Sequence, residues 1–271
     1  MCVTCGCGVN AETSFSVDQH EHVHADGTWH SHGGHVHPHD HGEPLAGRDR
    51  RSVELEAQIL GKNQLIAERN RGWLAGRGVL ALNMVSSPGA GKTALLERTL
   101  NDLKHEIRIG VIEGDQATSN DAERIRATGV PAVQINTGAG CHLEADMLER
   151  AIGLLQPERD SLMLIENVGN LVCPALFDLG ERAKVVVFSV TEGEDKPLKY
   201  PHMFAAASVV LLSKVDLLPY VRFDVSKAMA NALSVNPNLT FIELSAYSGA
   251  GLVRWYEWLK TELVRCASQG A

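Results

Sequence analysis

The chain has 271 residues, of which 44% are hydrophobic and 21% are charged, and this suffices for one sizeable globular domain with appendages. Its formal net charge of −8 argues against sequence-independent binding to nucleic acid phosphates or to an anionic membrane surface. No run of about 18 apolar residues is present, and the first thirty residues lack the apolar stretch of a secretory signal. We therefore expect a cytoplasmic protein that neither inserts into membranes nor binds nucleic acid.

Residues 1–50 form a segment rich in cysteine, histidine, glycine and aspartate, with almost no apolar periodicity. Such a segment buries too little apolar surface to offset the entropy of ordering, so we expect it to be disordered without metal. Nine of the 12 histidines lie between His20 and His41. Their imidazoles would form many weak, exchangeable sites for Ni²⁺, Zn²⁺ or Cu²⁺, which suits metal buffering. A solvated, pH-sensitive tail is the alternative.

Three of the 6 cysteines, Cys2, Cys5 and Cys7, crowd the start of the chain. In a reducing compartment such clustering indicates metal ligation before disulfide bonding. Three thiolates and the α-amino group in one plane would suit Ni²⁺, whereas a tetrahedral arrangement would suit Zn²⁺, and both geometries stay open. The alternative is that these cysteines lie in a disordered terminus and bind no metal.

Residues 51–78 carry apolar side chains at roughly helical spacing, which predicts an amphipathic helix packed on the domain that follows. Within residues 79–271, short apolar runs alternate with amphipathic stretches. The apolar runs are 79–85, 107–112, 132–135, 162–165, 185–190, 209–212 and 239–244. The helical patterns are 94–103, 143–155, 225–233 and 252–263. This alternation predicts one doubly wound α/β domain with a mainly parallel sheet and helices on both faces.

The first apolar run leads directly into Ser86-Ser87-Pro88-Gly89-Ala90-Gly91-Lys92-Thr93, and a helical pattern follows. This is close to the P-loop, whose backbone N–H groups surround phosphates at a helix N-terminus. The residues expected to hold the nucleotide here are Gly89, Ala90, Gly91, Lys92 and Thr93. Lys92 would reach the β- and γ-phosphates, and the Thr93 hydroxyl would bind Mg²⁺. Ser86 replaces the first glycine of the pattern, which requires a backbone that avoids positive φ there. The alternative is a glycine-rich turn.

Acidic residues end two of the predicted strands. Asp115 follows the second apolar run and Glu166 follows the fourth. Carboxylates at the carboxyl ends of parallel strands lie beside the P-loop, where Mg²⁺ and the attacking water must lie. We expect Asp115 to bind the metal's outer shell or to orient water, Glu166 to be the acid of the neighbouring strand, and the Gly169 N–H to sense the γ-phosphate. Alternatively, each acid merely caps the helix that follows it.

Base recognition is predicted to come from Leu212-Ser213-Lys214-Val215-Asp216, which ends another apolar run. Guanine-binding proteins usually carry Asn-Lys-x-Asp at this point. Because Ser213 replaces the asparagine here, Asp216 is the residue that we expect to recognise the base. Its carboxylate would accept two hydrogen bonds from guanine while the Lys214 stem covers the ring. Ser245 and Ala246, after the last run, match the loop that meets guanine O6 through a backbone N–H. Adenine offers no matching donor pair, so the pattern favours GTP over ATP.

Cys141, His142 and Cys173 are candidate metal ligands inside the α/β domain. Two adjacent ligands and one distant thiolate leave the site short of four, so water or a second subunit must complete it. Cys173 lies seven residues beyond Glu166, and a loop that moves with the γ-phosphate would move this ligand too. The alternative is that Cys141 and Cys173 are ordinary buried thiols, the role that we expect for Cys266.

These segments together resemble the HypB family of hydrogenase nickel-incorporation GTPases over nearly the whole chain. The matching segments are Cys2-Val3-Thr4-Cys5-Gly6-Cys7, the loop 86–93, Glu113-Gly114-Asp115-Gln116, Asn136-Thr137-Gly138 with Cys141-His142, the segment 166–174 and the segment 191–201. Matches of this length are far more specific than a P-loop alone.

The resemblance implies a GTPase that forms a homodimer around its nucleotides, in a group that includes the urease nickel chaperone. It also implies delivery of Ni²⁺ to the large subunit of nickel-iron hydrogenase, together with a zinc-binding partner, HypA. By the same resemblance, the N-terminal cysteines would form a tight nickel site, and Cys141, His142 and Cys173 a weaker nickel or zinc site shared between subunits. Slow GTP hydrolysis, at roughly 10⁻⁴ to 10⁻² s⁻¹ by analogy with small GTPases, would serve as a timer.

Two rival hypotheses remain. One is a nickel or zinc storage protein whose nucleotide site is mainly structural, which predicts equal nickel affinity in the GDP- and GTP-bound forms. The other is a phosphotransferase that acts on a small substrate. Against it stand the lack of a lid with several arginines and the guanine-type residues Lys214 and Asp216.

Overall fold

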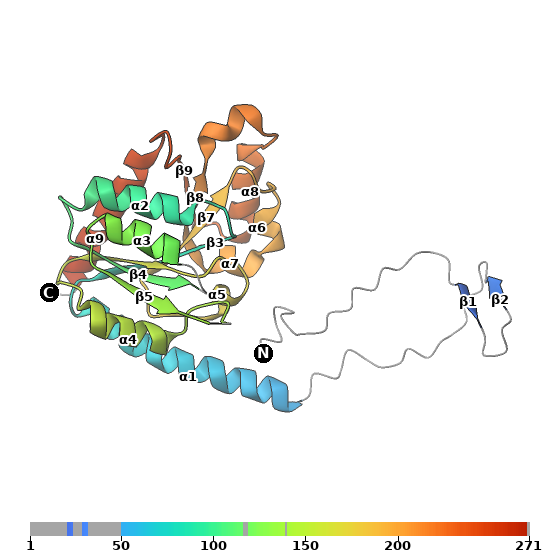
Figure 1. Cartoon of the computed structure of the whole chain (residues 1–271), viewed down its shortest axis with the longest axis horizontal. Helices are drawn as coiled ribbons and strands as arrows, with labels where there is room; N and C mark the ends of the chain where they lie inside the picture. Colours follow the sequence, from blue (N-terminus) through green and yellow to red (C-terminus); the bar gives the residue numbers. More distant parts are fainter. Residues whose placement is uncertain (1–20, 24–28, 32–49, 116–118, 139, 270–271) are drawn as a thin grey trace. The chain divides into compact units, whose positions relative to one another are not determined.

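The computed structural model describes residues 21–23, 29–31, 50–115, 119–138 and 140–269 (Figure 1). The chain divides into two units, Met1–Ala57 and Gln58–Ala271. In the first unit, strands β1 (Glu21–Val23) and β2 (Trp29–Ser31) pair antiparallel. The N-terminal cysteines, most of the histidine tract and the predicted disorder of the tail fall on residues outside those described.

A parallel sheet of seven described strands forms the centre of the second unit. The strands are β3 (Leu80–Ser86), β4 (Ile109–Asp115), β5 (Ala132–Asn136), β6 (Leu162–Glu166), β7 (Ala183–Ser189), β8 (Ala207–Ser213) and β9 (Thr240–Glu243). Their order is β5-β4-β6-β3-β7-β8-β9, and every neighbouring pair is parallel. The carboxyl ends of β4, β6 and β3 are therefore neighbours, which is where open α/β sheets bind ligands.

Helices cover both faces of this sheet (Figure 1). The longer helices are α1 (Arg50–Ala75), α2 (Lys92–Leu103), α3 (Ser119–Ala127), α4 (Ala145–Leu155), α8 (Val225–Val235) and α9 (Leu252–Gln269). The short helices are α5 (Cys173–Leu176), α6 (Lys196–Lys199), α7 (Pro201–Ala206) and the 3₁₀ helix η1 (Val215–Tyr220).

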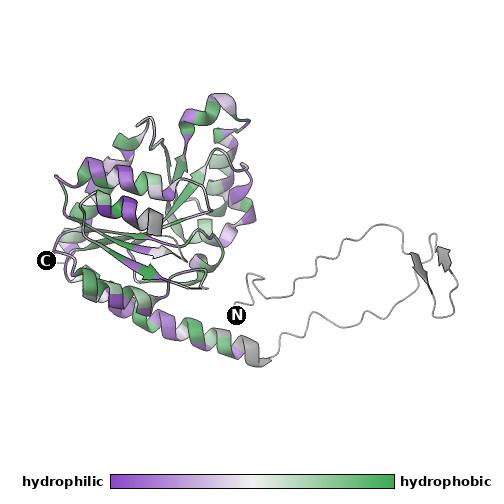
Figure 2. Ribbon diagram, in the orientation of Figure 1, coloured by the Kyte–Doolittle hydropathy of each residue, from purple (hydrophilic) through white to green (hydrophobic). Residues whose placement is uncertain are grey.

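Apolar side chains form a core on each face of the sheet. On one face, α2 and α9 pack against the central strands around the fully buried Trp255. On the other face, α4 and the end of α1 cover β3, β4 and β6, while α7 and α8 cover β7 and β8. Figure 2 shows hydrophobic residues along the strands and mixed hydrophobic and hydrophilic residues along the covering helices. Strands buried on both faces are continuous apolar runs in sequence, which is why the sequence predicts them.

The predicted doubly wound parallel sheet is confirmed, with shifts of a few residues at element ends. The predicted 51–78 helix corresponds to α1, and the boundary between the two units falls inside this helix. Helix α3 was not predicted, because its sequence SNDAERIRA is mostly polar. Among the described residues, no helix combines the length and the apolar character needed to cross a bilayer.

Candidate functional site

The loop between β3 and α2 bends sharply around a cavity. Gly89 and Gly91 have φ angles of 75° and 92°, which residues with a Cβ rarely adopt. Ser86, by contrast, is the last residue of β3 and has no positive φ. Its hydroxyl donates to the Ser87 carbonyl oxygen at 2.8 Å. A serine at the position of the pattern's first glycine is therefore compatible with this loop.

Lys92, Thr93 and Glu166 meet where α2 begins. The Lys92 Nζ donates to Glu166 Oε1 at 2.6 Å, and the Thr93 hydroxyl donates to the same oxygen at 2.7 Å. The Lys92 and Glu166 side chains are only 10% and 4% exposed. Within the described part of the chain, the buried Glu166 Oε2 has no hydrogen-bond partner. One carboxylate oxygen thus remains available for a cation.

Two adjoining cavities extend along this edge of the sheet. The first, of about 370 Å³, is lined by the loop 86–94 and by Glu113, Glu166 and Gly169, among others. A Cβ on Gly169 would lie 3.4 Å from Pro88, so the segment after β6 rests against the loop. The second cavity, of about 290 Å³, is lined by the loops that follow β8 and β9.

Gly91 and Ala94 line both cavities, so a molecule with phosphates in the first can extend into the second. A larger cavity of about 620 Å³ lies at the amino-terminal edge of β4, β5 and β6. Since it contains no predicted site residue, we leave it without a role.

The loop after β8 is attached to the phosphate loop by two hydrogen bonds. The Ser213 hydroxyl donates to the Ala90 carbonyl at 2.6 Å, and the Lys214 Nζ donates to the Gly89 carbonyl at 2.7 Å. Ser213 therefore holds the phosphate loop, while Asp216 lines the second cavity.

The loop after β9 forms the facing part of the second cavity through Ser245, Ala246 and Tyr247. The Ser245 hydroxyl accepts from the Ser248 N–H at 3.0 Å, and Arg98 donates to the Ala246 carbonyl at 3.3 Å. These two bonds fix the backbone of the loop that was predicted to contact a base.

Cys141, His142 and Cys173 form a compact cluster of metal-ligating atoms. The two sulfur atoms lie 2.9 Å apart, and the His142 Nδ1 lies 3.5 Å from the Cys141 sulfur. All three ligand atoms lie within 4.8 Å of one another. Cys173 starts α5 after β6, while the other two follow β5, so loops from either side of β4 converge here. Two sulfurs and an imidazole nitrogen suit Ni²⁺ or Zn²⁺.

The surroundings of His142 favour its neutral, metal-binding form. Its ring centroid lies 3.9 Å from that of Phe177, and burial lowers the pKa of the imidazole below its ordinary value. The His142 Nε2 lies 3.8 Å from Glu144 Oε1 and has no hydrogen-bond partner among the described residues. Burial, together with the charge of nearby Asp146, raises the pKa of the Glu144 carboxyl.

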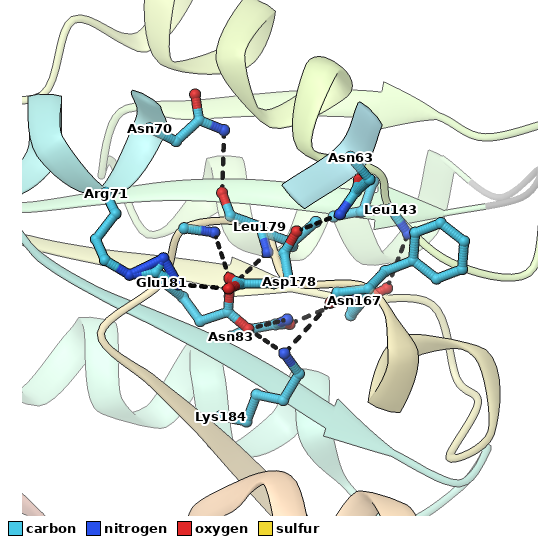
Figure 3. A network of polar contacts seen from close by, with 12 residues as sticks. Asn63, Asn70, Arg71, Asn83, Leu143, Asn167, Asp178, Leu179, Glu181 and Lys184 are labelled. Carbon is cyan, nitrogen blue, oxygen red and sulfur yellow. Dashed lines mark hydrogen bonds and ion pairs between the residues drawn. The ribbon is translucent and has the colours of Figure 1, made fainter. Parts of the chain in front are cut away.

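A buried polar network, drawn in Figure 3, extends from Asn167, the residue after Glu166, to Glu181 and Lys184. The Asn167 Oδ1 accepts from the Leu143 N–H at 3.2 Å and from the Val168 N–H at 2.9 Å. The Asn167 Nδ2 donates to Asn83 Oδ1 at 3.1 Å, and Asn83 in turn donates to Glu181 Oε1 at 3.1 Å. One amide thus connects the residue after His142 with the segment that follows Glu166.

The far end of the network is anchored by charge. The Lys184 Nζ donates to Glu181 Oε1 at 2.6 Å and to the Phe177 carbonyl at 3.3 Å. The Leu179 N–H donates to Glu181 Oε2 at 2.7 Å. These contacts hold the segment that carries Phe177 against His142.

Some predicted residues cannot be placed, and some lining residues were not predicted. Asp115 ends β4, in register with Asn136, but its side chain lies outside the described atoms. Glu113, buried on the same strand, lines the first cavity, and an acid beside an apolar run was the signal for it. Arg124 also lines this cavity, and since α3 itself was not predicted, the sequence carried no signal for this residue.

In this site a strand leads into a helix through glycines with positive φ, and the lysine at the start of the helix pairs with an acid at the end of a neighbouring strand. This arrangement defines the class of P-loop nucleotide-binding α/β proteins. A family profile agrees with this assignment. The profile described as "CobW/HypB/UreG, nucleotide-binding domain" matches residues 80–243.

Curated relatives narrow the class. The chain is 57% identical over 234 residues to the hydrogenase maturation factor HypB of Escherichia coli K12, covering 86% of this chain and 79% of that protein. It is 58% identical over 217 residues to HypB of Rhizobium leguminosarum, covering 80% and 73%. The chain therefore belongs to the HypB hydrogenase maturation factors of the CobW/HypB/UreG family.

Solved structures agree with this assignment. HypB from Archaeoglobus fulgidus superposes with a TM-score of 0.69 at 41% identity, over 75% of this chain and 99% of that one. HypB from Helicobacter pylori, solved in complex with nickel, superposes with a TM-score of 0.71 at 38% identity, over 75% and 96%.

Proposed function

We propose that this chain is a GTP-hydrolysing nickel metallochaperone that delivers Ni²⁺ to the large subunit of [NiFe]-hydrogenase, with its nucleotide state coupled to the Cys141–His142–Cys173 cluster. The hydrogen bonds of Asn167 are the observation that carries this proposal, because one buried amide binds both the nucleotide side and the metal side. The nickel bound by the H. pylori relative supports the choice of ion.

Mg²⁺ fits the residues beside the phosphate loop. The Thr93 hydroxyl and the Glu166 carboxylate form an oxygen donor set of the kind that Mg²⁺ prefers, and the unpartnered Glu166 Oε2 supplies a ligand atom. The predicted Asp115 would add an outer ligand. When bound, Mg²⁺ would neutralise charge on the β- and γ-phosphates.

The chain's own groups would bind and orient GTP. The loop N–H groups would hold the β-phosphate, and Lys92 would exchange Glu166 Oε1 for phosphate oxygens. Water would then attack the γ-phosphorus, giving GTP⁴⁻ + H₂O → GDP³⁻ + H₂PO₄⁻. The Gly169 N–H, close to Pro88 of the loop, would sense whether the γ-phosphate is present.

A second copy of the chain would complete the metal site. The cluster offers three ligands, one fewer than a closed tetrahedral site, so a homodimer or water must supply the fourth. We infer that nickel would enter through Cys2, Cys5 and Cys7 or from a HypA-like, zinc-binding nickel chaperone. Zn²⁺ would be the competing occupant of the cluster.

Asp216→Asn is expected to exchange guanine for xanthine recognition. The carboxylate offers two acceptors to guanine N1–H and N2–H, whereas an amide offers one donor and one acceptor, which match the xanthine O2 and N1–H. An unpaired buried donor costs about 1–3 kcal/mol, so GTP affinity should fall roughly tenfold to hundredfold. Titration with fluorescent GTP and XTP analogues measures this. A variant that still prefers GTP would show that Asp216 does not read the base.

The coupling itself can be measured in a protein whose N-terminal cysteines are all changed to serine. Thiolate-to-nickel charge-transfer absorption then reports the Cys141–Cys173 cluster, because histidine-bound nickel gives no such band. The nickel affinity is expected to differ about 5–150-fold between the GDP form and a non-hydrolysable GTP form. Equal affinities would favour the storage hypothesis.

Asn167→Ala is expected to reduce this ratio to near one while both ligands still bind. The matched control is Asn70→Ala, which removes another buried amide, one that donates to the Ala145 and Leu179 carbonyls. Loss of coupling in both variants would indicate that removing any buried amide disturbs the packing, and it would not support a specific role of Asn167.

A further inference from the structure

Arg124 is a cationic residue of the first cavity to which the proposed mechanism gives no task. It lies on α3 and lines the cavity together with Lys92, Glu113 and Glu166. Among the described lining residues, Lys92 and Arg124 carry the positive charges. Lys92 is already held by Glu166 inside the cavity. Arg124 is a second cation, beside Lys92, that a phosphate in this cavity can attract.

One acidic partner of Arg124, Glu97, is not among the residues that line the cavity. The Arg124 Nε and one terminal nitrogen donate to Glu97 Oε2, on α2, at 3.1 Å and 2.7 Å. The two side chains are 45% and 35% exposed, and ion pairs that exposed are weak. Both of these donors share one Glu97 oxygen, whereas a γ-phosphate carries more negative charge and offers the guanidinium two oxygens, one for each parallel N–H group. Exchanging Glu97 for a phosphate is therefore favourable.

We propose that Arg124 is a catalytic residue for GTP hydrolysis, which leaves Glu97 and donates hydrogen bonds to the γ-phosphate oxygens. This inference rests on the proposed GTPase function. As the water oxygen bonds to the γ-phosphorus, the bond to the β,γ-bridging oxygen breaks and its electron pair stays on GDP. The water's proton ends on the released phosphate. Arg124 keeps its own protons and stabilises the charge that spreads over the γ-phosphate oxygens.

The first test is the rate of GTP hydrolysis by the full chain carrying Arg124→Ala. We expect kcat to fall about 30-fold, the ratio between GTPases that carry an arginine in cis and those that lack one. GDP affinity should stay unchanged, because GDP lacks the γ-phosphate. Binding of aluminium fluoride with GDP, a mimic of the transferring phosphoryl group, should be lost. Arg124→Lys keeps the positive charge but lacks the planar guanidinium with its two parallel donors. This variant should fold normally and also hydrolyse GTP slowly.

Two neighbouring residues serve as matched controls. Arg126 lies on the same helix and donates to Gln134 Oε1 at 3.2 Å, so Arg126→Ala should keep the wild-type rate. Glu97→Gln removes this ion pair but keeps the Arg124 guanidinium that would bind phosphate, so it should also retain hydrolysis.

The outcomes separate a catalytic role from a structural one. A kcat within about threefold of wild type in Arg124→Ala would overturn the proposal. An equal loss in Glu97→Gln would overturn it too, since the ion pair would then be the feature that matters. A wild-type chain that hydrolyses no GTP would instead overturn the proposed function on which the inference rests.

Discussion

Replacing Lys92 with alanine is expected to lower kcat for GTP hydrolysis about 10²–10³-fold, the loss typical for one preorganised hydrogen-bond donor. The ammonium group reaches the β- and γ-phosphates, and no other described lining residue can take its place at the start of α2. Single-turnover hydrolysis of radiolabelled GTP measures this loss directly.

The same substitution should also destabilise the protein without nucleotide. Lys92 and Glu166 are a buried pair, and removing one partner leaves the other charge uncompensated, at a cost of about 3–5 kcal/mol. Urea denaturation should show this cost, and Lys92→Ala with Glu166→Gln should recover much of it without recovering hydrolysis.

Lys104→Ala is the matched control for Lys92. Lys104 follows the end of α2 and donates to the Thr128 carbonyl at 2.7 Å, away from the phosphate loop. This variant should hydrolyse GTP at the wild-type rate. Hydrolysis by Lys92→Ala within about tenfold of wild type would contradict the P-loop mechanism.

Replacing Cys173 with serine is expected to weaken nickel binding at the cluster more than about 100-fold, beyond the 10–100-fold effect of residues that only hold a metal ligand in place. A hydroxyl is a much poorer ligand for Ni²⁺ than a thiolate. The thiolate charge-transfer band, measured with the N-terminal cysteines changed to serine, should lose most of its intensity. Nucleotide affinity measured without nickel should not change, because Cys173 lines neither nucleotide cavity.

Cys266→Ser is the matched control for this experiment. Cys266 is also buried, and its thiol donates to the Val79 carbonyl at 3.5 Å from the far end of α9. It should leave the charge-transfer band intact. A cluster that keeps its nickel affinity without Cys173 would remove the physical basis of the delivery proposal.

The pH dependence of nickel binding should follow from proton release. Ligands must be deprotonated to bind metal, so affinity should rise with pH. Burial lowers the pKa of His142, so the imidazole becomes neutral at a lower pH than that of an exposed histidine. The part of the rise that comes from His142 should therefore fall at a lower pH than for an exposed histidine, and nickel titrations at a series of pH values measure it.

The sequence was sufficient to predict the sheet but not all of the site. Parallel strands such as β6 and β7 are buried on both faces, so their apolar runs identify them without any knowledge of contacts. Helix α3 has no such pattern, and Arg124 was missed with it. The P-loop was predicted because its chemistry depends on local spacing, and the base-binding loop stays a prediction made on the same ground.

The buried network escaped prediction for a different reason. Asn83 lies 84 residues from Asn167 and 98 from Glu181, so no local pattern relates them. Such polar residues inside apolar strands become meaningful only when the fold brings their partners together. Ser213 is a similar case, because its partner, the Ala90 carbonyl, is 123 residues away.

The two hydrogen bonds from Ser213 and Lys214 to the Ala90 and Gly89 carbonyls have a consequence for fidelity. A nucleotide whose base forced the β8 loop outward would pull on the very peptide groups that align its phosphates. An incorrect base would then be discriminated twice, once at entry and again as slower turnover.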